Sequence, residues 1–177
     1  DRGKEFVDAT YLKLGAIDLQ DQVDGVKHLS KRAYIDGDRV GIYGHSYGGY
    51  LSALAVLKFP EVFHVAVSGA PVTTWKNYDT IYTERYMRTP LENPDGYRIG
   101  SCMQYAKNLK GKLLMVHGLI DDNVHPSNTW QLVEALHAAD RRFDMQIYPK
   151  FKHGIGSTYM KIRWEYLCRH LQLAPGS

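Results

Sequence analysis

The sequence predicts an α/β fold in which a mostly parallel sheet is covered by helices on both faces. Short, nearly continuous apolar runs alternate along the chain with longer segments of helical periodicity, and Gly or Pro ends most of the apolar runs. Strands that are buried on both faces have this composition, and strand–helix alternation is typical of βαβ units. The length of 177 residues suits one domain, so we expect residues 1–177 to form a single domain with one site.

The first expected elements are a helix over 18–32, a strand over 38–44 and a helix over 47–59. Four apolar residues of the first segment recur at intervals of three or four: Leu19, Val23, Val26 and Leu29. This spacing predicts an amphipathic helix with Asp18 near its N-cap. The third segment is rich in Leu and Ala until Pro60 stops it.

The alternation continues to the end of the chain with one interruption. Strands are expected over 63–71, 112–118 and 143–150, and helices over 127–140 and 158–171. Residues 73–108 are rich in tyrosine and contain Pro90 and Pro94, so we expect a helical excursion between two strands. Long connections of this kind are often functional.

Composition argues against several classes of protein. The formal net charge is +3 and the basic residues are scattered singly, which does not favour a nucleic-acid-binding stripe. Cys102 and Cys168 are too few for a disulfide scaffold, and neither has the spacing of a metal site. No run approaches the ~18 apolar residues of a membrane span, so no membrane contact is expected from this chain.

Residues 44–48, Gly-His-Ser-Tyr-Gly, form a G-x-S-x-G pattern between an expected strand and an expected helix. A serine at such a strained turn exposes its hydroxyl, and small neighbours let the backbone pack closely. The helix that follows directs its first amide groups at the site, where they favour negative charge. The pattern therefore predicts the nucleophile elbow of an α/β-hydrolase fold with Ser46 as nucleophile; the alternative is an ordinary glycine-rich corner.

A nucleophilic serine needs a base and a residue that orients the base, and in this fold they follow in the order acid, then His. Asp121 and Asp122 follow the strand 112–118, and His153 follows the strand 143–150. Asp121 is the favoured acid because it lies nearer the strand end, while Asp122 suits a turn or helix cap; both could also be solvated loop carboxylates. The seven other histidines are discounted by position: His28, His137 and His170 in helices, His45 in the elbow, His64 at a strand start, His117 before the acids and His125 close beside them.

Several longer segments resemble one known family: "DRVGIYGHSYGGY", "VFHVAVSGAPVTTW", "YTERYM", "ENPDGY", "HGLIDDNVH" and the "HG" at 153–154, with "RG", "F" and "LG" near the start. The chain resembles the prolyl oligopeptidase family of serine peptidases, and within it the dipeptidyl peptidase IV branch. The resemblance implies Ser46 as nucleophile, Asp121 as triad acid and His153 as general base. It also implies that the backbone N–H of Tyr47 is an oxyanion-hole donor.

The resemblance further implies a proline-accepting pocket. Its walls would be Tyr78, Tyr82, Trp75, Val72 and Val124, with Asn123 bonding a substrate carbonyl. Tyr78, Tyr82 and Tyr86 recur every four residues, so they share one face if 77–87 is helical. Aromatic walls suit a compact apolar ring, although spacing alone is also compatible with an aromatic stripe that packs on the sheet; Tyr86 is expected in the core.

The resemblance also sets expectations for the whole protein. The chain would be the C-terminal part of a longer enzyme, lacking the first strands of the hydrolase domain, a tyrosine that is the second oxyanion donor, and a β-propeller whose paired glutamates hold the substrate amine. A homodimer through the last helix and strand is expected, with no metal and no organic cofactor. The resemblance favours a periplasmic, secreted or cell-envelope location and leaves a cytoplasmic one open.

The expected reaction is hydrolysis of a peptide bond after proline or alanine near the substrate N-terminus, releasing a dipeptide or a tripeptide. Two alternatives remain at this point. One is a carboxylesterase or acylaminoacyl peptidase of the same fold, and the other is a non-catalytic fragment that only packs against partners.

Overall fold

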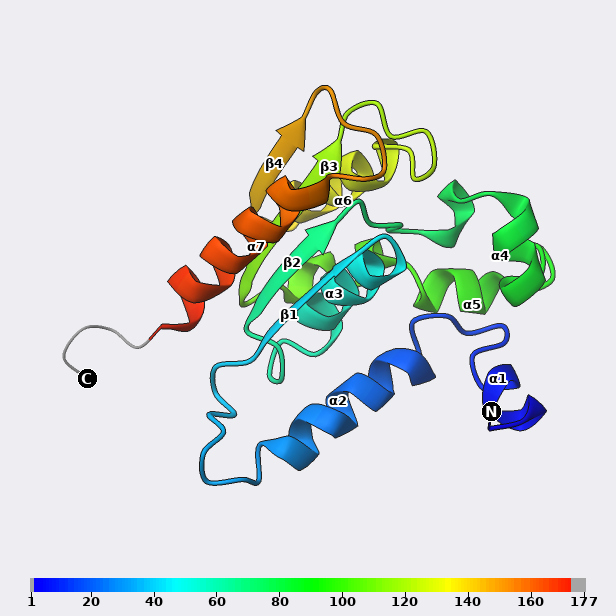
Figure 1. Ribbon diagram of the computed structural model, residues 1–177. Coiled ribbons are helices and arrows are strands. Elements are labelled where there is room, and N and C mark those ends of the chain that lie inside the picture. Colours follow the sequence, from blue (N-terminus) through cyan, green and yellow to red (C-terminus); the bar gives the residue numbers. More distant parts are fainter. Residues whose placement is uncertain (1, 173–177) are drawn as a thin grey trace.

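The computed structural model describes residues 2–172 and contains one parallel sheet of four strands in the order β1-β2-β3-β4 (Figure 1). The strands are β1 (Gly41–His45), β2 (Val65–Gly69), β3 (Lys112–Gly118) and β4 (Asp144–Tyr148). Each strand pairs in parallel with the next one in the sequence. The carboxyl ends of all four strands therefore lie at one edge, where the loops that follow them meet.

Helices cover both faces of this sheet, as expected for an α/β-hydrolase fold. Helices α3 (Tyr47–Lys58) and α6 (Ser127–Ala138) contribute to the larger core, and α7 (Gly156–Leu171) covers the opposite face (Figure 1). Strand residues alternate between the two cores: Leu113 and Met115 join the larger one, while Leu114 and Val116 join the one under α7.

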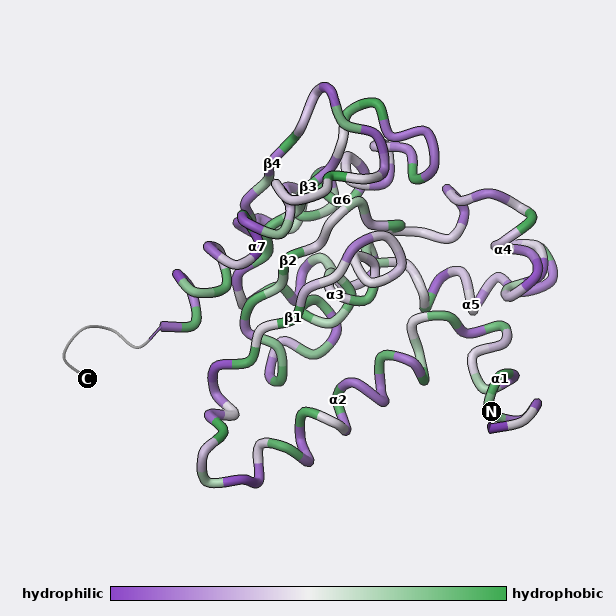
Figure 2. Tube along the Cα trace, in the orientation of Figure 1, coloured by the Kyte–Doolittle hydropathy of each residue, from purple (hydrophilic) through white to green (hydrophobic). Residues whose placement is uncertain are grey.

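Helix α3 is the most deeply buried helix of the described chain. Every residue from Ser52 to Leu57 is buried. Its residues from Leu51 to Leu57 are apolar apart from Ser52 (Figure 2), which is typical of a helix enclosed by other elements. Helix α2 (Ile17–Leu29) instead alternates between polar and apolar residues and buries only Leu19 and Val23. The helix that follows the candidate nucleophile is therefore anchored in the core.

The predicted strands and helices are confirmed in type and order, with shifts at their ends. Strand β1 begins at Gly41, three residues later than predicted, because Asp36 and Arg39 close a turn before it through an ion pair of 2.6 Å. Helix α2 has Ala16 at its N-cap and Asp18 in its first turn, close to the N-cap as predicted. Helix α1 (Lys4–Asp8) was not predicted, since it buries no residue and so leaves no periodic apolar signal.

The tyrosine-rich excursion consists of four short helices: η1 (Trp75–Asn77), α4 (Thr80–Met87), α5 (Pro94–Ile99) and η2 (Cys102–Asn108). The condition under which the three tyrosines would share one face, a helix over 77–87, is met only from Thr80 onward. Asp79 caps α4 by accepting a hydrogen bond of 2.8 Å from the Tyr82 N–H, so Tyr78 is extended and lies outside the helix.

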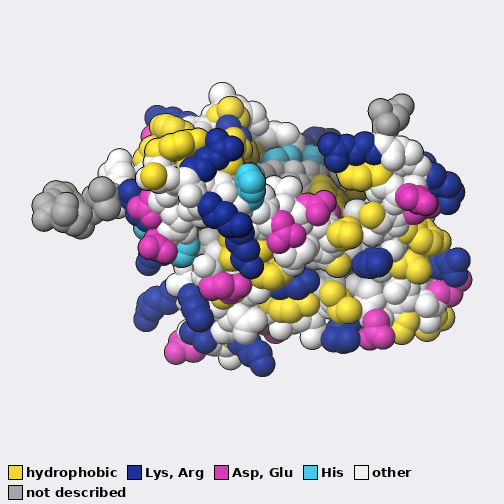
Figure 3. Space-filling view, turned by 90° about the horizontal axis from the view of Figure 1, so that it is seen from below, with side chains coloured by type: hydrophobic (Ala, Val, Ile, Leu, Met, Phe, Trp, Pro, Cys, Tyr) yellow, Lys and Arg dark blue, Asp and Glu magenta, His cyan; other side chains and the backbone are white. Residues whose placement is uncertain are grey.

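On the face shown in Figure 3, Lys and Arg side chains are spread among Asp and Glu side chains rather than gathered into one stripe. Both cysteines are free. Within residues 2–172, no helix combines the length and apolar character needed to cross a membrane, and no cluster of three or more metal-binding side chains occurs.

Candidate active site

Ser46 lies at the turn between β1 and α3, in the geometry that the elbow pattern predicts. Its backbone has φ 60° and ψ −117°, a strained conformation for a residue with a side chain. The Ser46 N–H donates to the Gly69 carbonyl at 2.8 Å, and the Ser46 carbonyl accepts from the Tyr50 N–H at 2.9 Å. Both backbone groups are thus bonded, and the hydroxyl is presented at the carboxyl edge of the sheet.

Two glycines allow this turn to pack against its neighbours. A Cβ at Gly49 would lie 2.2 Å from the Gly69 carbonyl oxygen, and a Cβ at Gly44 would lie 2.3 Å from the backbone of Gly48. Real side chains do not approach this closely, so the elbow requires glycine at both positions. The conformation of Ser46 is therefore imposed by the surrounding backbone.

The loops after β3 and β4 bring Asp121 and His153 together. His153 Nδ1 lies 2.8 Å from Asp121 Oδ2, and because a carboxylate only accepts, Nδ1 is the donor and Nε2 of the neutral ring carries no proton. The other oxygen of Asp121 accepts from the N–H groups of Asn123 and Val124, both at 3.0 Å. The side chain of Asp121 is fully buried, so these donors compensate its charge where water cannot.

The remaining acidic and basic groups of these loops have other partners. Asp122 lies in a bend of its loop and forms an exposed ion pair with Lys152 at 2.6 Å. His117 is buried, and its ring nitrogens lie 2.7 Å from Thr129 Oγ1 and 2.9 Å from the Val124 carbonyl. Burial lowers the pKa of His117, which keeps the ring neutral beside Asp121.

His45 contributes to the site although its position in the elbow gave no reason to expect this. Its ring centroid lies 4.7 Å from that of His153 and 5.8 Å from that of Tyr159 in α7. Burial, followed by the nearby His153, lowers the pKa of His45. No sequence signal marks this contact, because the loop that carries His153 reaches the elbow only in the folded chain.

His45, the residue before Ser46 in the chain, connects the elbow to His153 through the ring contact of 4.7 Å. Among the described residues, the Ser46 hydroxyl has no hydrogen bond to His153. In proteins without a bound substrate, such catalytic hydrogen bonds are often long and tighten only in the complex. The arrangement places a serine, a histidine and a buried carboxylate at one edge of the sheet.

The N–H of Tyr47 remains available to a ligand. Tyr47 is the first residue of α3, and the first N–H groups of a helix have no partner within it. They also carry the positive end of the helix dipole. This N–H is therefore suited to a negatively charged oxygen beside Ser46.

A small cavity of about 90 Å³ adjoins Ser46. It is lined by Ser46, Tyr47, Val72, Trp75, Tyr78 and Tyr82. Trp75 and Tyr82 stack with centroids 5.9 Å apart, and Tyr78 meets Tyr82 edge-on at 5.3 Å. Four of the six predicted pocket residues thus form its aromatic and apolar walls.

The other two predicted pocket residues lie beside this cavity rather than in its lining. Asn123 Oδ1 accepts a hydrogen bond of 3.2 Å from the Tyr78 hydroxyl. Val124 is completely buried, and its backbone joins Asp121 to His117. Tyr86 packs against the larger core, as expected.

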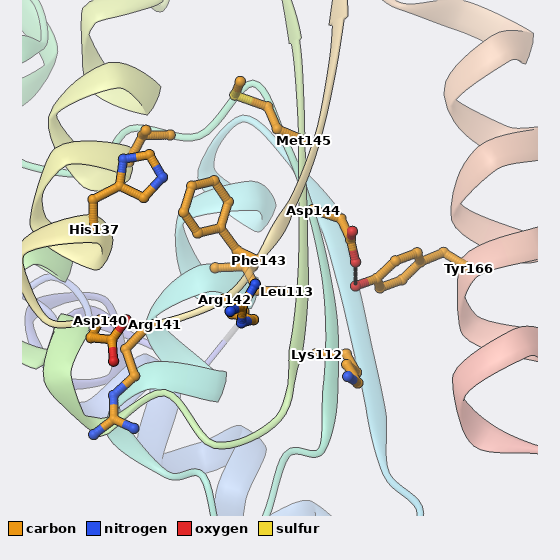
Figure 4. A pocket seen from close by; sticks show the side chains of 11 residues that line it. Lys112, Leu113, His137, Asp140, Arg141, Arg142, Phe143, Asp144, Met145 and Tyr166 are labelled. Atoms are coloured by element: carbon orange, nitrogen blue, oxygen red, sulfur yellow. Dashed lines mark hydrogen bonds between the residues drawn. The ribbon is translucent and has the colours of Figure 1, made fainter.

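A larger cavity of about 680 Å³ lies at the opposite end of the strands, where β3 and β4 begin (Figure 4). Lys112, Arg142 and His137 are among its polar walls, and Asp144 there accepts a hydrogen bond of 2.7 Å from Tyr166. None of the predicted site residues lines it. Ligands of open α/β sheets bind at the carboxyl ends of the strands, so we take the small aromatic cavity as the candidate site.

Comparison with curated proteins finds dipeptidyl peptidases. The chain is 46% identical to human dipeptidyl peptidase 8 over 181 residues, which covers 99% of this chain and 20% of that protein. It is 37% identical to bovine dipeptidyl peptidase 4 over 160 residues, covering 89% of this chain and 21% of that protein. The chain thus spans about a fifth of the length of these relatives.

Solved structures of similar proteins have the same fold. The dipeptidyl peptidase 4 of Porphyromonas gingivalis superposes with a TM-score of 0.90 at 39% identity, covering 96% of this chain and 25% of that one. A dipeptidyl aminopeptidase IV from Bacteroides ovatus, described as putative, gives 0.92 at 38% identity with the same coverage. Residues 1–172 match the prolyl oligopeptidase family. The chain therefore belongs to the prolyl oligopeptidase family of serine peptidases and has its α/β-hydrolase fold.

Proposed function

We propose that the protein is a serine peptidase that cleaves peptide bonds after proline or alanine near the substrate N-terminus, with Ser46, Asp121 and His153 as catalytic triad. The observation that carries the proposal is the 2.8 Å contact between His153 Nδ1 and the buried Asp121, at the edge of the sheet where Ser46 occupies a strained elbow. A buried acid, an oriented imidazole and an exposed serine are the parts that acyl transfer requires.

In the proposed reaction, His153 Nε2 takes the proton of the Ser46 hydroxyl while the serine oxygen attacks the substrate carbonyl. The resulting oxyanion accepts a hydrogen bond from the Tyr47 N–H, and Asp121 stabilises the protonated imidazole. His153 then gives its proton to the leaving amine, which breaks the peptide bond. Water hydrolyses the acyl-enzyme by the same steps with His153 again as base.

The aromatic cavity supports proline as the residue before the cleaved bond. Trp75, Tyr78 and Tyr82 offer flat apolar walls around a volume of only about 90 Å³, which suits a compact ring and excludes long side chains. Asn123, held next to Tyr78, is proposed to bind a substrate carbonyl. Alanine is the second residue that this small volume admits.

The proposal includes partners in the intact protein. Family resemblance supports a second oxyanion donor from a tyrosine, paired glutamates on a β-propeller for the substrate amine, and a homodimer through the last helix and strand. Light scattering of the intact protein tests the dimer. Release of dipeptides against tripeptides from a proline-containing peptide, followed by mass spectrometry, tests how the amine is positioned.

A fluorophosphonate probe tests the nucleophile in the intact protein. We expect covalent labelling at Ser46, found by peptide mapping, and loss of labelling in Ser46→Ala. Comparison of Gly-Pro-anilide with a short p-nitrophenyl ester tests the substrate, and we expect cleavage of the anilide. Cleavage of the ester alone would indicate an esterase, and an unlabelled protein that cleaves neither substrate would show a non-catalytic chain.

A further inference from the structure

The carboxylate of Asp18 lies behind the candidate pocket, on an element that the catalytic mechanism does not use. Asp18 is in the first turn of α2, and its Oδ2 accepts hydrogen bonds from the Tyr47 hydroxyl and, at 3.1 Å, from the Gly15 N–H. Its Oδ1 is buried without a hydrogen-bond partner among the described residues. A carboxylate oxygen hidden from water costs free energy, so one expects a compensating role.

The segment before α2 is shaped to make this contact. Gly15 has φ +81°, and a Cβ there would lie 1.9 Å from the hydroxyl oxygen of Tyr50. That hydroxyl lies 3.0 Å from the Leu14 carbonyl and 2.9 Å from the Gly100 carbonyl. Residues 14–18 are thus held against α3 by two of its tyrosines, Tyr47 through Asp18 and Tyr50 through the backbone.

Tyr47 connects Asp18 to the reacting centre. Its ring lines the cavity beside Ser46 and packs between Tyr50 and Trp75, with both centroid distances 5.7 Å. Its backbone N–H is the proposed oxyanion donor. Burial and the bond to Asp18 hold the pKa of Tyr47 far above its usual value, so the phenol keeps its proton and donates to the carboxylate.

The bond to Asp18 holds the hydroxyl end of the Tyr47 ring. Tyr50 and Trp75 pack against the Tyr47 ring. The hydroxyl at the far end of the ring still needs a hydrogen-bond partner, which without Asp18 would have to be water or a group in the cavity. Hydrogen bonds to an ionised acceptor are about twice as strong as neutral ones, which suits a carboxylate for this role. The ring then forms a wall of constant position.

We propose that Asp18 is a positioning residue that fixes the Tyr47 ring as a wall of the pocket and so sets the preference for proline over smaller residues. The inference rests on the proposed function and extends it to a residue outside the triad and the pocket lining. Without the carboxylate the ring moves, the cavity changes shape, and a rigid substrate ring loses more contact than a methyl group does.

The test compares Gly-Pro-anilide and Gly-Ala-anilide as substrates of the intact wild-type protein, Asp18→Ala and Asp18→Asn. For Asp18→Ala we expect the ratio of kcat/KM for the two substrates to fall about tenfold, mainly through a higher KM for the proline substrate. Asp18→Asn keeps an acceptor for the Tyr47 hydroxyl, so it should recover much of the ratio. Tyr47→Phe combined with Asp18→Ala should add little to either single change, because both remove one interaction.

Two control variants separate positioning from stability. Asp21→Asn removes an exposed carboxylate from the same helix, and Tyr50→Phe removes the hydroxyl that bonds the Leu14 and Gly100 carbonyls while keeping the ring that packs on Tyr47 and the bond from Tyr47 to Asp18. Both should keep the wild-type substrate ratio, and Tyr50→Phe should lower Tm. An unchanged ratio in Asp18→Ala, or in Tyr47→Phe if the alanine variant does not fold, would overturn the inference, as would an equal change in Tyr50→Phe.

Fluorophosphonate labelling of Ser46 distinguishes this result from a failure of the proposed function. We expect all Asp18 variants to be labelled, because the probe does not need the proline pocket. A wild-type protein that is labelled and cleaves both anilides, with variants of unchanged ratio, would reject the role of Asp18 alone. A wild-type protein that is neither labelled nor active would reject the proposed function and this inference together.

Discussion

The elbow that carries Ser46 and the loops that carry Asp121 and His153 hold their side chains in different ways. The elbow is fixed by backbone contacts, with the Ser46 N–H bonded to Gly69 and no room for a Cβ at Gly49. The orientation of the His153 imidazole depends instead on one side-chain contact of 2.8 Å, and 26% of that side chain is exposed.

This difference teaches that the position of the candidate nucleophile depends on the packing of the fold, whereas the orientation of the candidate base depends on one polar side-chain contact. Changes in the loops should therefore affect turnover more than stability. Changes in the elbow should lower the free energy of unfolding more than they lower turnover. The following predictions test this contrast from the largest expected effect to the smallest.

Asp121→Asn should have the largest effect. An amide in place of the carboxylate no longer stabilises the protonated His153 and favours the wrong tautomer, so kcat for Gly-Pro-anilide should fall on the order of 10⁴-fold. The matched control is Asp122→Asn at the next position, which loses only an exposed ion pair with Lys152 and should keep its turnover. Equal losses in the two variants would contradict the assignment of the acid.

Gly49→Ala should destabilise the fold by about 3 kcal/mol, because the new Cβ would lie 2.2 Å from the Gly69 carbonyl oxygen and the elbow would have to shift. Urea unfolding followed by circular dichroism measures this change. Gly48→Ala is the control one residue earlier in the same helix, where a Cβ has open space within 4 Å. Its stability should change by less than about 1 kcal/mol, and similar losses at both positions would argue against steric control.

The buried His117 should make the fold sensitive to acid. Burial lowers its pKa in the folded state, while in the unfolded chain it titrates near 6.5, so below that pH the unfolded state binds more protons. The free energy of unfolding should then fall as the pH drops below about 6.5, by at most about 1.4 kcal/mol per pH unit from this group, and be unaffected by it above. Urea unfolding of His117→Gln between pH 5 and 7 should show a shallower slope than wild type; parallel slopes would contradict the prediction.

Lys152→Ala should have the smallest effect, although the ion pair with Asp122 joins the two loops that carry the acid and the base. Both side chains are more than half exposed, and ion pairs in water contribute little. Tm and kcat should both remain at wild-type values. A clear fall in kcat would show that the ion pair helps to hold the His153 loop.

Much of the fold could be predicted because the strands are recognisable from short local segments of the sequence. The runs that became β2 and β3 are apolar and end in glycine, and the actual bounds of β3 match the predicted ones. The first helix, α1, buries nothing and left no pattern. Whether 77–87 is helical was left open by the equal spacing of the tyrosines, and the Asp79 cap begins α4 only after Tyr78.

Much of the candidate site could also be predicted from the sequence. Ser46, Asp121 and His153 follow strand ends in an order that can be read along the chain, and the aromatic residues near Trp75 cluster within one segment. His45 and Asp18 could not be found in this way. Their importance depends on His153 and Tyr47, which are distant from them in sequence or lie on another element.

The sequence by itself determined the order of strands and helices, the elbow and the loops that hold an acid and a histidine, because each depends on residues close together in the chain. Only the tertiary structure decided that the Asp121 side chain is fully buried and lies 2.8 Å from His153, that His45 packs on the same imidazole, and that Asp18 holds the far end of Tyr47. These contacts depend on side-chain direction and on the meeting of separate loops. Such distances are fixed only when the sheet brings its carboxyl ends together.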